Sequence, residues 1–273
     1  MKNEYSQNKL HDYLECPRRY ELKYLIQRVW PAVLSEPVLE MEQQIKNGKK
    51  FHLLAQQYFS GINQDDIVKQ IDDEKMNIWW DNFIQFADQF LSLPHQPEVL
   101  ISSIINSYRF KGVFDLLVYS PGEKFIIVDW KTNQHKPDKK LLEQHIQTRL
   151  YPLILAQAGE QWNNNQKILP GQIEMIYWFA NYPDGPETFT YSQHNFQMDL
   201  DFVQNLVQKI ENTKINEFEL TKNEKTCLFC NYRSLCSRGT KPGNQSESNF
   251  LDIEYFYEEI DEIDMNLIGE IAF

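Results

Sequence analysis

The chain has 273 residues, which suits one large domain or one domain with a small annex. Apolar residues make up 42% of the chain and charged residues of both signs 24%, which permits a sizeable core and excludes general disorder. No run of about 18 apolar residues occurs, which excludes a membrane-spanning helix, and the first residues lack the apolar stretch of a secretory signal. We therefore expect a cytoplasmic protein that binds no membrane, whose cysteines bind metal or stay free rather than form disulfides.

The net charge of −12 is unevenly distributed. Nine acidic residues and no lysine or arginine lie between Glu247 and Phe273, so the rest of the chain has a charge of −12 + 9 = −3. A near-neutral body with a local basic patch can still hold a phosphate backbone. The charge therefore does not exclude a nucleic-acid partner.

The first predicted elements are helices. Residues 7–28 are typical of two helices that begin after Ser6 as the N-cap and meet at Pro17, because proline interrupts a helix. Apolar residues at mixed spacings of three and four predict further helices over residues 38–60 and 65–92.

Strands and helices then alternate, which predicts an α/β domain. The expected strands cover residues 99–105, 108–119, 124–130, 173–180 and 187–191, and the expected helices cover residues 141–159 and 196–213. Ser120-Pro121-Gly122-Glu123 is typical of a hairpin turn between the second and third strands. We expect one domain over residues 1–238, followed by a linker and acidic tail over residues 239–273.

The cysteines lie at the two ends of this domain, at Cys16, Cys227, Cys230 and Cys236. The last three have the spacing C-x2-C-x5-C, and the first lies 227 − 16 = 211 residues upstream. Four thiolates suit an iron–sulfur cluster or tetrahedral zinc, and the short C-x2-C spacing lets two sulfurs reach one centre. The alternative is a set of free, partly buried thiols. Composition alone does not choose between iron–sulfur and zinc.

Two aspartates and a lysine interrupt otherwise apolar strands. Asp115 and Asp129 are surrounded by Val, Ile, Leu and Phe, where a charge is costly unless it is paired or binds metal. Asp129 and Lys131 are two residues apart and share one face of a strand. Folding the hairpin about its turn places Asp115 opposite Val128, so that the two carboxylates become neighbours.

Two close carboxylates repel each other and attract a hard divalent cation such as Mg²⁺ or Mn²⁺. Such an ion can polarise a phosphoryl oxygen and generate hydroxide from bound water, and Lys131 can orient that water. Glu98 is a further acidic candidate. The alternative is a structural Asp–Lys pair near a strand end.

Several motifs, in order along the chain, resemble those of PD-(D/E)XK nucleases. Asp115 followed by Asp129-Trp130-Lys131 resembles the D-x(n)-D-x-K core of that class. Residues 147–151, Gln-Thr-Arg-Leu-Tyr, match the Q-x3-Y signature of the RecB-like branch, and residues 48–52, Gly-Lys-Lys-Phe-His, resemble its G-x3-H helix. The order of these motifs supports the resemblance more than any one of them.

The cysteine motifs resemble those of the iron–sulfur members of the same branch, which include CRISPR-associated iron–sulfur exonucleases and AddB-type helicase–nucleases. Residues 16–18, Cys-Pro-Arg, resemble their opening motif, and the C-x2-C-x5-C triplet resembles their closing one. The resemblance spans residues 6 to about 238. The GxxxxGK[ST] loop of a helicase motor does not occur in this sequence, which indicates a nuclease that acts alone or with protein partners such as a helicase or CRISPR adaptation proteins.

The resemblance implies a restriction-endonuclease-like core, in which helices flank a central mixed sheet. It also implies a helical iron–sulfur annex, over about 1–30 and 220–238, that joins the N- and C-termini. His52, Asp115 and Asp129 would ligate Mg²⁺ or Mn²⁺, Lys131 would be the catalytic lysine, and Gln147 and Tyr151 would position the lysine or the scissile strand. The cofactor implied for Cys16, Cys227, Cys230 and Cys236 is a [4Fe–4S] cluster.

A basic and aromatic segment lies next to Cys16 and contains Arg18, Arg19 and Lys23 interleaved with tyrosines. This composition suits single-stranded nucleic acid, although an amphipathic helix with a solvated basic face has the same pattern. The tail is either a solvated segment or a lid that mimics DNA or docks a partner. We therefore expect a metal-dependent exonuclease that acts on single-stranded DNA ends, in repair, recombination or CRISPR-type processing. The alternatives are a non-catalytic iron–sulfur DNA-binding subunit and a zinc-stapled structural protein.

Overall fold

The structure is a computed structural model that describes residues 4–28, 36–228 and 230–239. The predicted acidic tail, with all of the preceding linker except Gly239, lies outside the described residues. None of the helices in the described part of the chain combines the length and the apolar character that crossing a bilayer requires.

Six strands of the described residues form one mixed sheet. Their bounds are β1 Glu4–Ser6, β2 His95–Ile105, β3 Tyr108–Ser120, β4 Lys124–Lys131, β5 Ile173–Phe179 and β6 Glu187–Thr190. β2 runs antiparallel along the length of β3, β4 pairs antiparallel with β3 and parallel with β5, and β6 pairs antiparallel with β5. β1 pairs parallel with β3. Five of these strands were predicted, but β1 was not, because a strand of three residues has too little sequence pattern to be recognised.

The helices confirm most of the predicted segments and divide three of them. They are α1 Gln7–Glu15, α2 Pro17–Tyr20, the π-helix Glu21–Leu25, α3 Glu36–Phe59, α4 Gln64–Val68, α5 Glu74–Leu91, α6 Lys139–Gln144, α7 Ile146–Ala158 and α8 Gln193–Asn212. The Ser6 hydroxyl caps α1 by accepting from the backbone N–H of Lys9, and the first break falls at Pro17 as predicted. The breaks between α4 and α5 and between α6 and α7 were not predicted.

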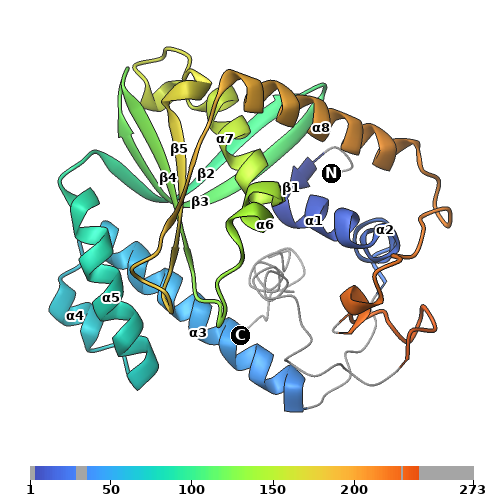
Figure 1. Ribbon diagram of the computed structural model, residues 1–273, viewed down its shortest axis with the longest axis horizontal. Coiled ribbons are helices and arrows are strands. Elements are labelled where there is room, and N and C mark those ends of the chain that lie inside the picture. The colour runs from blue at the N-terminus through green and yellow to red at the C-terminus, as the bar shows by residue number, and fades with distance from the viewer. Residues whose placement is uncertain (1–3, 29–35, 229, 240–273) are drawn as a thin grey trace, which may run out of the picture.

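Helices cover both faces of the sheet, so that the core has two layers (Figure 1). On one face α1, α7 and α8 pack on the sheet through a cluster that includes Leu10, Leu150 and Val207. On the other face α3, α4 and α5 contribute an aromatic cluster in which the ring of Phe59 stacks on that of Trp130. The structure therefore confirms the expected restriction-endonuclease-like arrangement of a mixed sheet between helices.

The predicted hairpin is confirmed, but its register differs by one residue. β3 and β4 pair so that Leu116, not Asp115, lies opposite Val128. The turn after Ser120 contains three residues before Lys124, which shifts the pairing relative to a turn centred on Pro121 and Gly122. If this register is extended by one residue, Asp115 lies opposite Asp129. The two carboxylates are therefore one position closer to each other than the sequence predicted.

The N- and C-terminal segments of the described chain are joined by specific contacts. The Glu21 carboxylate, which is fully buried, accepts from the backbone N–H of Asn216 and pairs with Arg18. The Thr226 hydroxyl donates to Glu15 (3.0 Å), and the Tyr5 hydroxyl donates to Glu211 (2.5 Å). The Thr226–Glu15 contact therefore joins the two parts of the expected annex, and the other two contacts tie its N-terminal part to the end of α8 and the residues that follow.

Candidate active site

The candidate site lies at an opening in the sheet along one edge of β3. β1 pairs with residues 109–111 at that edge, and β4 pairs with residues 116–120. Within the described chain, residues 112–115 therefore have no strand partner there. Because β4 continues past this point with only β5 beside it, Asp115 and Asp129 lie where the strands separate.

Asp115 is held in place by the backbone of the neighbouring strand. The N–H of Trp130 donates to Asp115 Oδ2 over 2.9 Å, and this contact is buried. Glu98 lies between Pro97 and Val99, whose partners Leu116 and Phe114 flank Asp115 on β3, and its backbone has a φ of 48°. A residue other than glycine rarely adopts this left-handed backbone conformation, because it costs about 1–3 kcal/mol. A strained glutamate beside a buried aspartate points to a functional constraint on Glu98.

His52, Glu98 and Asp115 form a group that can hold a cation. One ligand atom from each residue lies within 4.8 Å of the others, and His52 Nδ1 is 3.3 Å from Asp115 Oδ1. Burial opposes protonation of His52, but the carboxylates of Asp115, Glu98 and Asp129 outweigh it and raise the pKa of His52 to about 9. Without a metal the imidazole therefore carries a proton at neutral pH, and binding a cation displaces that proton. One nitrogen and several carboxylate oxygens are a suitable donor set for Mn²⁺ or Mg²⁺.

A second group consists of Asp129, Lys131 and Gln147, all of them buried. Lys131 Nζ lies 2.6 Å from Asp129 Oδ2 and donates to Gln147 Oε1 over 2.9 Å. The Gln147 amide donates in turn to Asp129 Oδ1 over 2.5 Å. The three side chains form a closed triangle, with Gln147 on α7 holding both the carboxylate and the ammonium of β4. The structure thus joins the predicted D-x-K and Q-x3-Y motifs through Gln147.

Tyr177 was not predicted as a site residue, but it contacts both Lys131 and Gln147 of this group. Tyr177 is opposite Asp129 in the β4–β5 register, and Lys131 Nζ lies 5.4 Å from the centre of its ring. Its hydroxyl hydrogen-bonds Thr148 (2.8 Å) and donates to Gln147 Oε1 (3.5 Å). No motif could have identified Tyr177, because its role follows from the pairing of two strands more than 40 residues apart in sequence.

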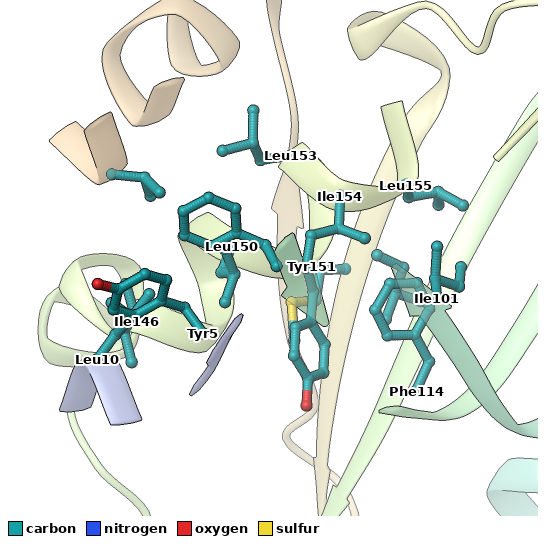
Figure 2. Packing of buried hydrophobic residues seen from close by; sticks show 14 of the residues in the cluster. Tyr5, Leu10, Ile101, Phe114, Ile146, Leu150, Tyr151, Leu153, Ile154 and Leu155 are labelled. Atoms are coloured by element: carbon teal, nitrogen blue, oxygen red, sulfur yellow. The ribbon is translucent and has the colours of Figure 1, made fainter. Parts of the chain in front are cut away.

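Tyr151 lies one helical turn beyond Gln147 and packs in the core. Its ring centre is 4.7 Å from that of Phe114, and its ring lies so close to Gly112 that a side chain there would clash. Figure 2 shows the ring beside Phe114 and Ile101, with the hydroxyl at the end remote from the aliphatic side chains. Gly112 borders the opening in the sheet, so the contact fixes α7 against β3 next to the site.

The predicted nucleic-acid-binding residues all have acidic partners in the same segment. Arg18 pairs with Glu21, while Arg19 and Lys23 both pair with Asp12, over 2.8 and 2.9 Å. Burial raises the pKa of Asp12, but the two cations outweigh it and the net shift is downward. These basic residues therefore stabilise the α1–α2 segment, and a nucleic acid would have to compete with the carboxylates for them.

The four cysteines lie in the two segments of the expected annex. Cys16 is the N-cap residue of α2, and the other three lie in the segment that follows α8. Burial raises the pKa of Cys230 to about 11 and raises those of Cys227 and Cys236, and the charge of Cys16 raises all three further. Cys16 therefore lies near enough to the C-terminal triplet to influence it electrostatically, while a metal site shared by the four thiols stays a prediction.

Comparison with known proteins agrees with this geometry. The family description of the PD-(D/E)XK nuclease superfamily matches residues 4–237. A crystal structure from Eubacterium rectale, named putative exonuclease, matches with a TM-score of 0.50 and 15% identity, over 82% of this chain and 85% of that one. The protein SSO0001 matches with a TM-score of 0.40 and 13% identity over 86% of each chain, which is too low to establish a common fold. No curated protein matches the chain.

The match to the Eubacterium rectale structure concerns the fold, while the family match also covers every residue of the two groups at the opening in the sheet. Their arrangement, with Asp115 and Asp129 on adjacent strands and Lys131 two residues further on, is the one that the D-x(n)-D-x-K pattern describes. The match spans more than half of the sequence, and this chain belongs to the PD-(D/E)XK nuclease superfamily.

Proposed function

We propose that this protein is a Mg²⁺- or Mn²⁺-dependent nuclease of the RecB-like branch that hydrolyses DNA phosphodiester bonds as an exonuclease on single-stranded ends. The proposal rests above all on one observation, that the His52–Glu98–Asp115 group lies beside the Asp129–Lys131–Gln147 triangle. A cytoplasmic location and partners such as a helicase or CRISPR adaptation proteins are part of this proposal.

Some residues of the site would bind the metal ion, and others would assist the reaction directly. His52, Glu98, Asp115 and Asp129 would hold the divalent ion, which supplies Lewis-acid polarisation of a phosphoryl oxygen and a more acidic bound water. The Lys131 ammonium can donate a hydrogen bond to the attacking water or to the oxygen on which charge develops. Gln147 keeps Lys131 in position through its amide oxygen.

The preference for single strands draws on the segment next to Cys16. The Tyr24 ring lies under the ammonium groups of Lys9 and Lys23, at 5.6 and 4.9 Å. Aromatic rings beside cations suit a strand whose bases are unpaired, because a base can stack while its phosphate is neutralised.

The test is a cleavage assay with end-labelled single- and double-stranded DNA and either Mn²⁺ or Mg²⁺. Asp129→Ala and Lys131→Ala should each lower the rate by at least about 100-fold, the usual effect of removing one group that stabilises the transition state. Asp199→Ala is the matched control, because Asp199 is a buried aspartate that pairs with Arg149 away from this site. Retained activity in either active-site variant would refute the assignment. An inactive wild-type protein that still binds DNA would favour the non-catalytic subunit.

We also propose that Cys16, Cys227, Cys230 and Cys236 bind a [4Fe–4S] cluster. Their four-sulfur donor set and the electrostatic influence of Cys16 on the other three thiols support this, and both also suit zinc. Metal analysis of anaerobically purified protein separates the two, since about four iron atoms per chain support the cluster and one zinc atom contradicts it.

A further inference from the structure

One face of the β2–β3 hairpin is apolar and basic and is open to solvent. Leu100 is 63% exposed, Ile104 66% and Val113 41%. Leu100 lies directly opposite Val113, and Ile104 lies directly opposite Arg109, so these four side chains share one face with Lys111. The term apolar–basic strip is used below for the set Leu100, Ile104, Arg109, Lys111 and Val113.

This strip adjoins the candidate metal group. Glu98 lies two residues before Leu100 on β2, and Asp115 lies two residues after Val113 on β3. Two residues of a strand span about 7 Å. Within the described chain β2 pairs only with β3, so the other edge of β2 offers backbone N–H and C=O groups to a further segment.

The chain itself contains a segment with the complementary chemistry. Between residues 250 and 257 bulky apolar residues predominate, and residues 258–264 contain five acids among seven residues. From residue 247 onward no lysine or arginine occurs. The charged members of the strip, Arg109 and Lys111, have the opposite sign. Lys111 pairs with Glu4 over 3.0 Å and Arg109 donates to Ser102, so an acidic segment has to compete with Glu4 for Lys111.

We propose that residues 250–264 of this chain dock on the apolar–basic strip, with the apolar half on Leu100, Ile104 and Val113 and the acidic half beside Arg109 and Lys111. Residues 240–249 can span about 30 Å when extended, against a radius of gyration of about 18 Å for a domain of this size. The connection is therefore long enough to cross much of the domain. A tethered segment also has an effective concentration of about millimolar, which favours it over a second copy of the chain.

The experiment uses the full chain with the photo-crosslinker p-benzoylphenylalanine in place of Ile104, and in a second variant in place of Leu100. Leu169 is the matched control position, since it is also apolar and 63% exposed but lies away from the strip. We expect crosslinks from positions 104 and 100 to residues 250–264, identified by mass spectrometry, and none from position 169 to that segment. Charge reversal by Arg109→Glu with Lys111→Glu should lower the yield about tenfold, since two surface ion pairs become two repulsions.

Three outcomes would overturn the proposal. The first is the absence of crosslinks between the strip and residues 250–264 at both positions. The second is a mixture of isotopically light and heavy chains in which these crosslinks join different chains, which would indicate docking between copies. The third is crosslinking of positions 100 and 104 to an added oligonucleotide but never to the tail, which would make the strip a nucleic-acid surface. Because none of these readouts depends on catalysis, an inactive enzyme would leave the docking test valid.

Discussion

Glu98 is the residue at which the backbone of the site is most unusual. Its left-handed φ of 48° occurs inside a strand, near a buried aspartate and His52. Strain of this kind persists only where surrounding structure maintains it, and it is concentrated at functional sites. We infer that the distortion turns the Glu98 carboxylate toward the cation position.

Glu98→Gln tests this directly, because it keeps the size of the side chain and removes its charge. The variant should bind Mn²⁺ at least about tenfold more weakly in calorimetry, since removing one charged oxygen ligand weakens a hard-cation site. Glu174→Gln is the control, because Glu174 lies on β5 and pairs with Lys124. Equal Mn²⁺ affinity in wild type and Glu98→Gln would show that Glu98 is not a ligand.

Tyr177 offers a second test, because its hydroxyl contacts Gln147 and Thr148 while its ring lies beneath Lys131. Tyr177→Phe keeps the ring and should lower kcat about tenfold through loss of the positioning hydrogen bond, with little change in Mn²⁺ affinity. The pH–rate profile should also shift, because Lys131 would be held less firmly beside Asp129.

The control for that experiment is Tyr191→Phe. Tyr191 is a buried tyrosine whose hydroxyl donates to Asp199 away from the site, so the two variants lose comparable hydrogen bonds. If both variants lower kcat to the same degree and leave the pH profile unchanged, Tyr177 has only a structural role.

At this scale the sequence predicted the residues that motifs contain and not those that depend on strand register. Lys131 contacts Asp129 and Gln147, and Asp115 lies on the adjacent strand. Strand geometry predicted the closeness of the two aspartates and Lys131, whereas the position of Gln147 was expected only from the family resemblance. Tyr177 was not predicted as a site residue, because a tyrosine in an apolar strand usually belongs to the core. Glu98 was named only as a further acidic candidate, because its position in the site depends on a local distortion of the backbone.

At the scale of elements, the main difference between expectation and structure is the break at His145. A single helix was predicted over residues 141–159, but His145 has φ −64° and ψ 140° and separates α6 from α7. Apolar residues continue through the break, so periodicity could not reveal it. The break matters because it lets α7 begin at Ile146 with Gln147 in its first turn.

His145 is also buried, which predicts a pH dependence of stability. Burial, and then the charges of His11 and Lys131, hold the pKa of His145 well below its ordinary value of 6.5. The unfolded chain therefore takes up a proton below pH 6.5 that the folded chain does not. Stability should be complete above pH 6.5 and fall as the pH drops below it, by at most about 1.4 kcal/mol per pH unit for this proton.

Urea unfolding between pH 7.5 and 5.5 measures this slope in wild type, in His145→Asn and in the control His194→Asn. Asparagine is a suitable N-cap, so the substitution should preserve the start of α7. His194 is exposed near the start of α8. The decline in stability should be shallower in His145→Asn alone, and an equal slope in all three proteins would assign the effect to other groups.

At the scale of the whole molecule, the two ends of the described chain form one unit that supports the site. α1 packs on α7, and Leu10 and Ile146, both labelled in Figure 2, belong to the same buried cluster. Since α7 carries Gln147, which accepts a hydrogen bond from Lys131, the position of Lys131 depends on the N-terminal segment. The buried Glu21 in turn ties that segment to Asn216. The sequence predicted the joining of the ends from its cysteines, but it gave no sign of the Glu21–Asn216 contact.

The proposed cluster would close a loop of 227 − 16 = 211 residues between Cys16 and Cys227. For a covalent crosslink, a loop of this size restricts the unfolded chain by about 5 kcal/mol. A cluster whose ligands lie in both segments would act in the same sense, and its binding free energy would add to the stability of the fold. The contacts of Glu21, Thr226 and Tyr5 tie the N-terminal segment to the end of α8 and the residues that follow, so some residual structure should survive the loss of the cluster.

Cys16→Ser should therefore lose bound metal and lower the free energy of unfolding by several kcal/mol, measured by anaerobic urea denaturation together with metal analysis. Leu14→Ser is the control, because Leu14 is a neighbouring apolar residue that is 44% exposed. The variant should also cleave DNA more slowly at temperatures where it remains folded, because loosening α1 releases α7 and with it Gln147. Unchanged melting in Cys16→Ser would contradict the structural role of the cluster. A destabilised variant with full activity would show instead that the annex stabilises the domain without positioning Gln147.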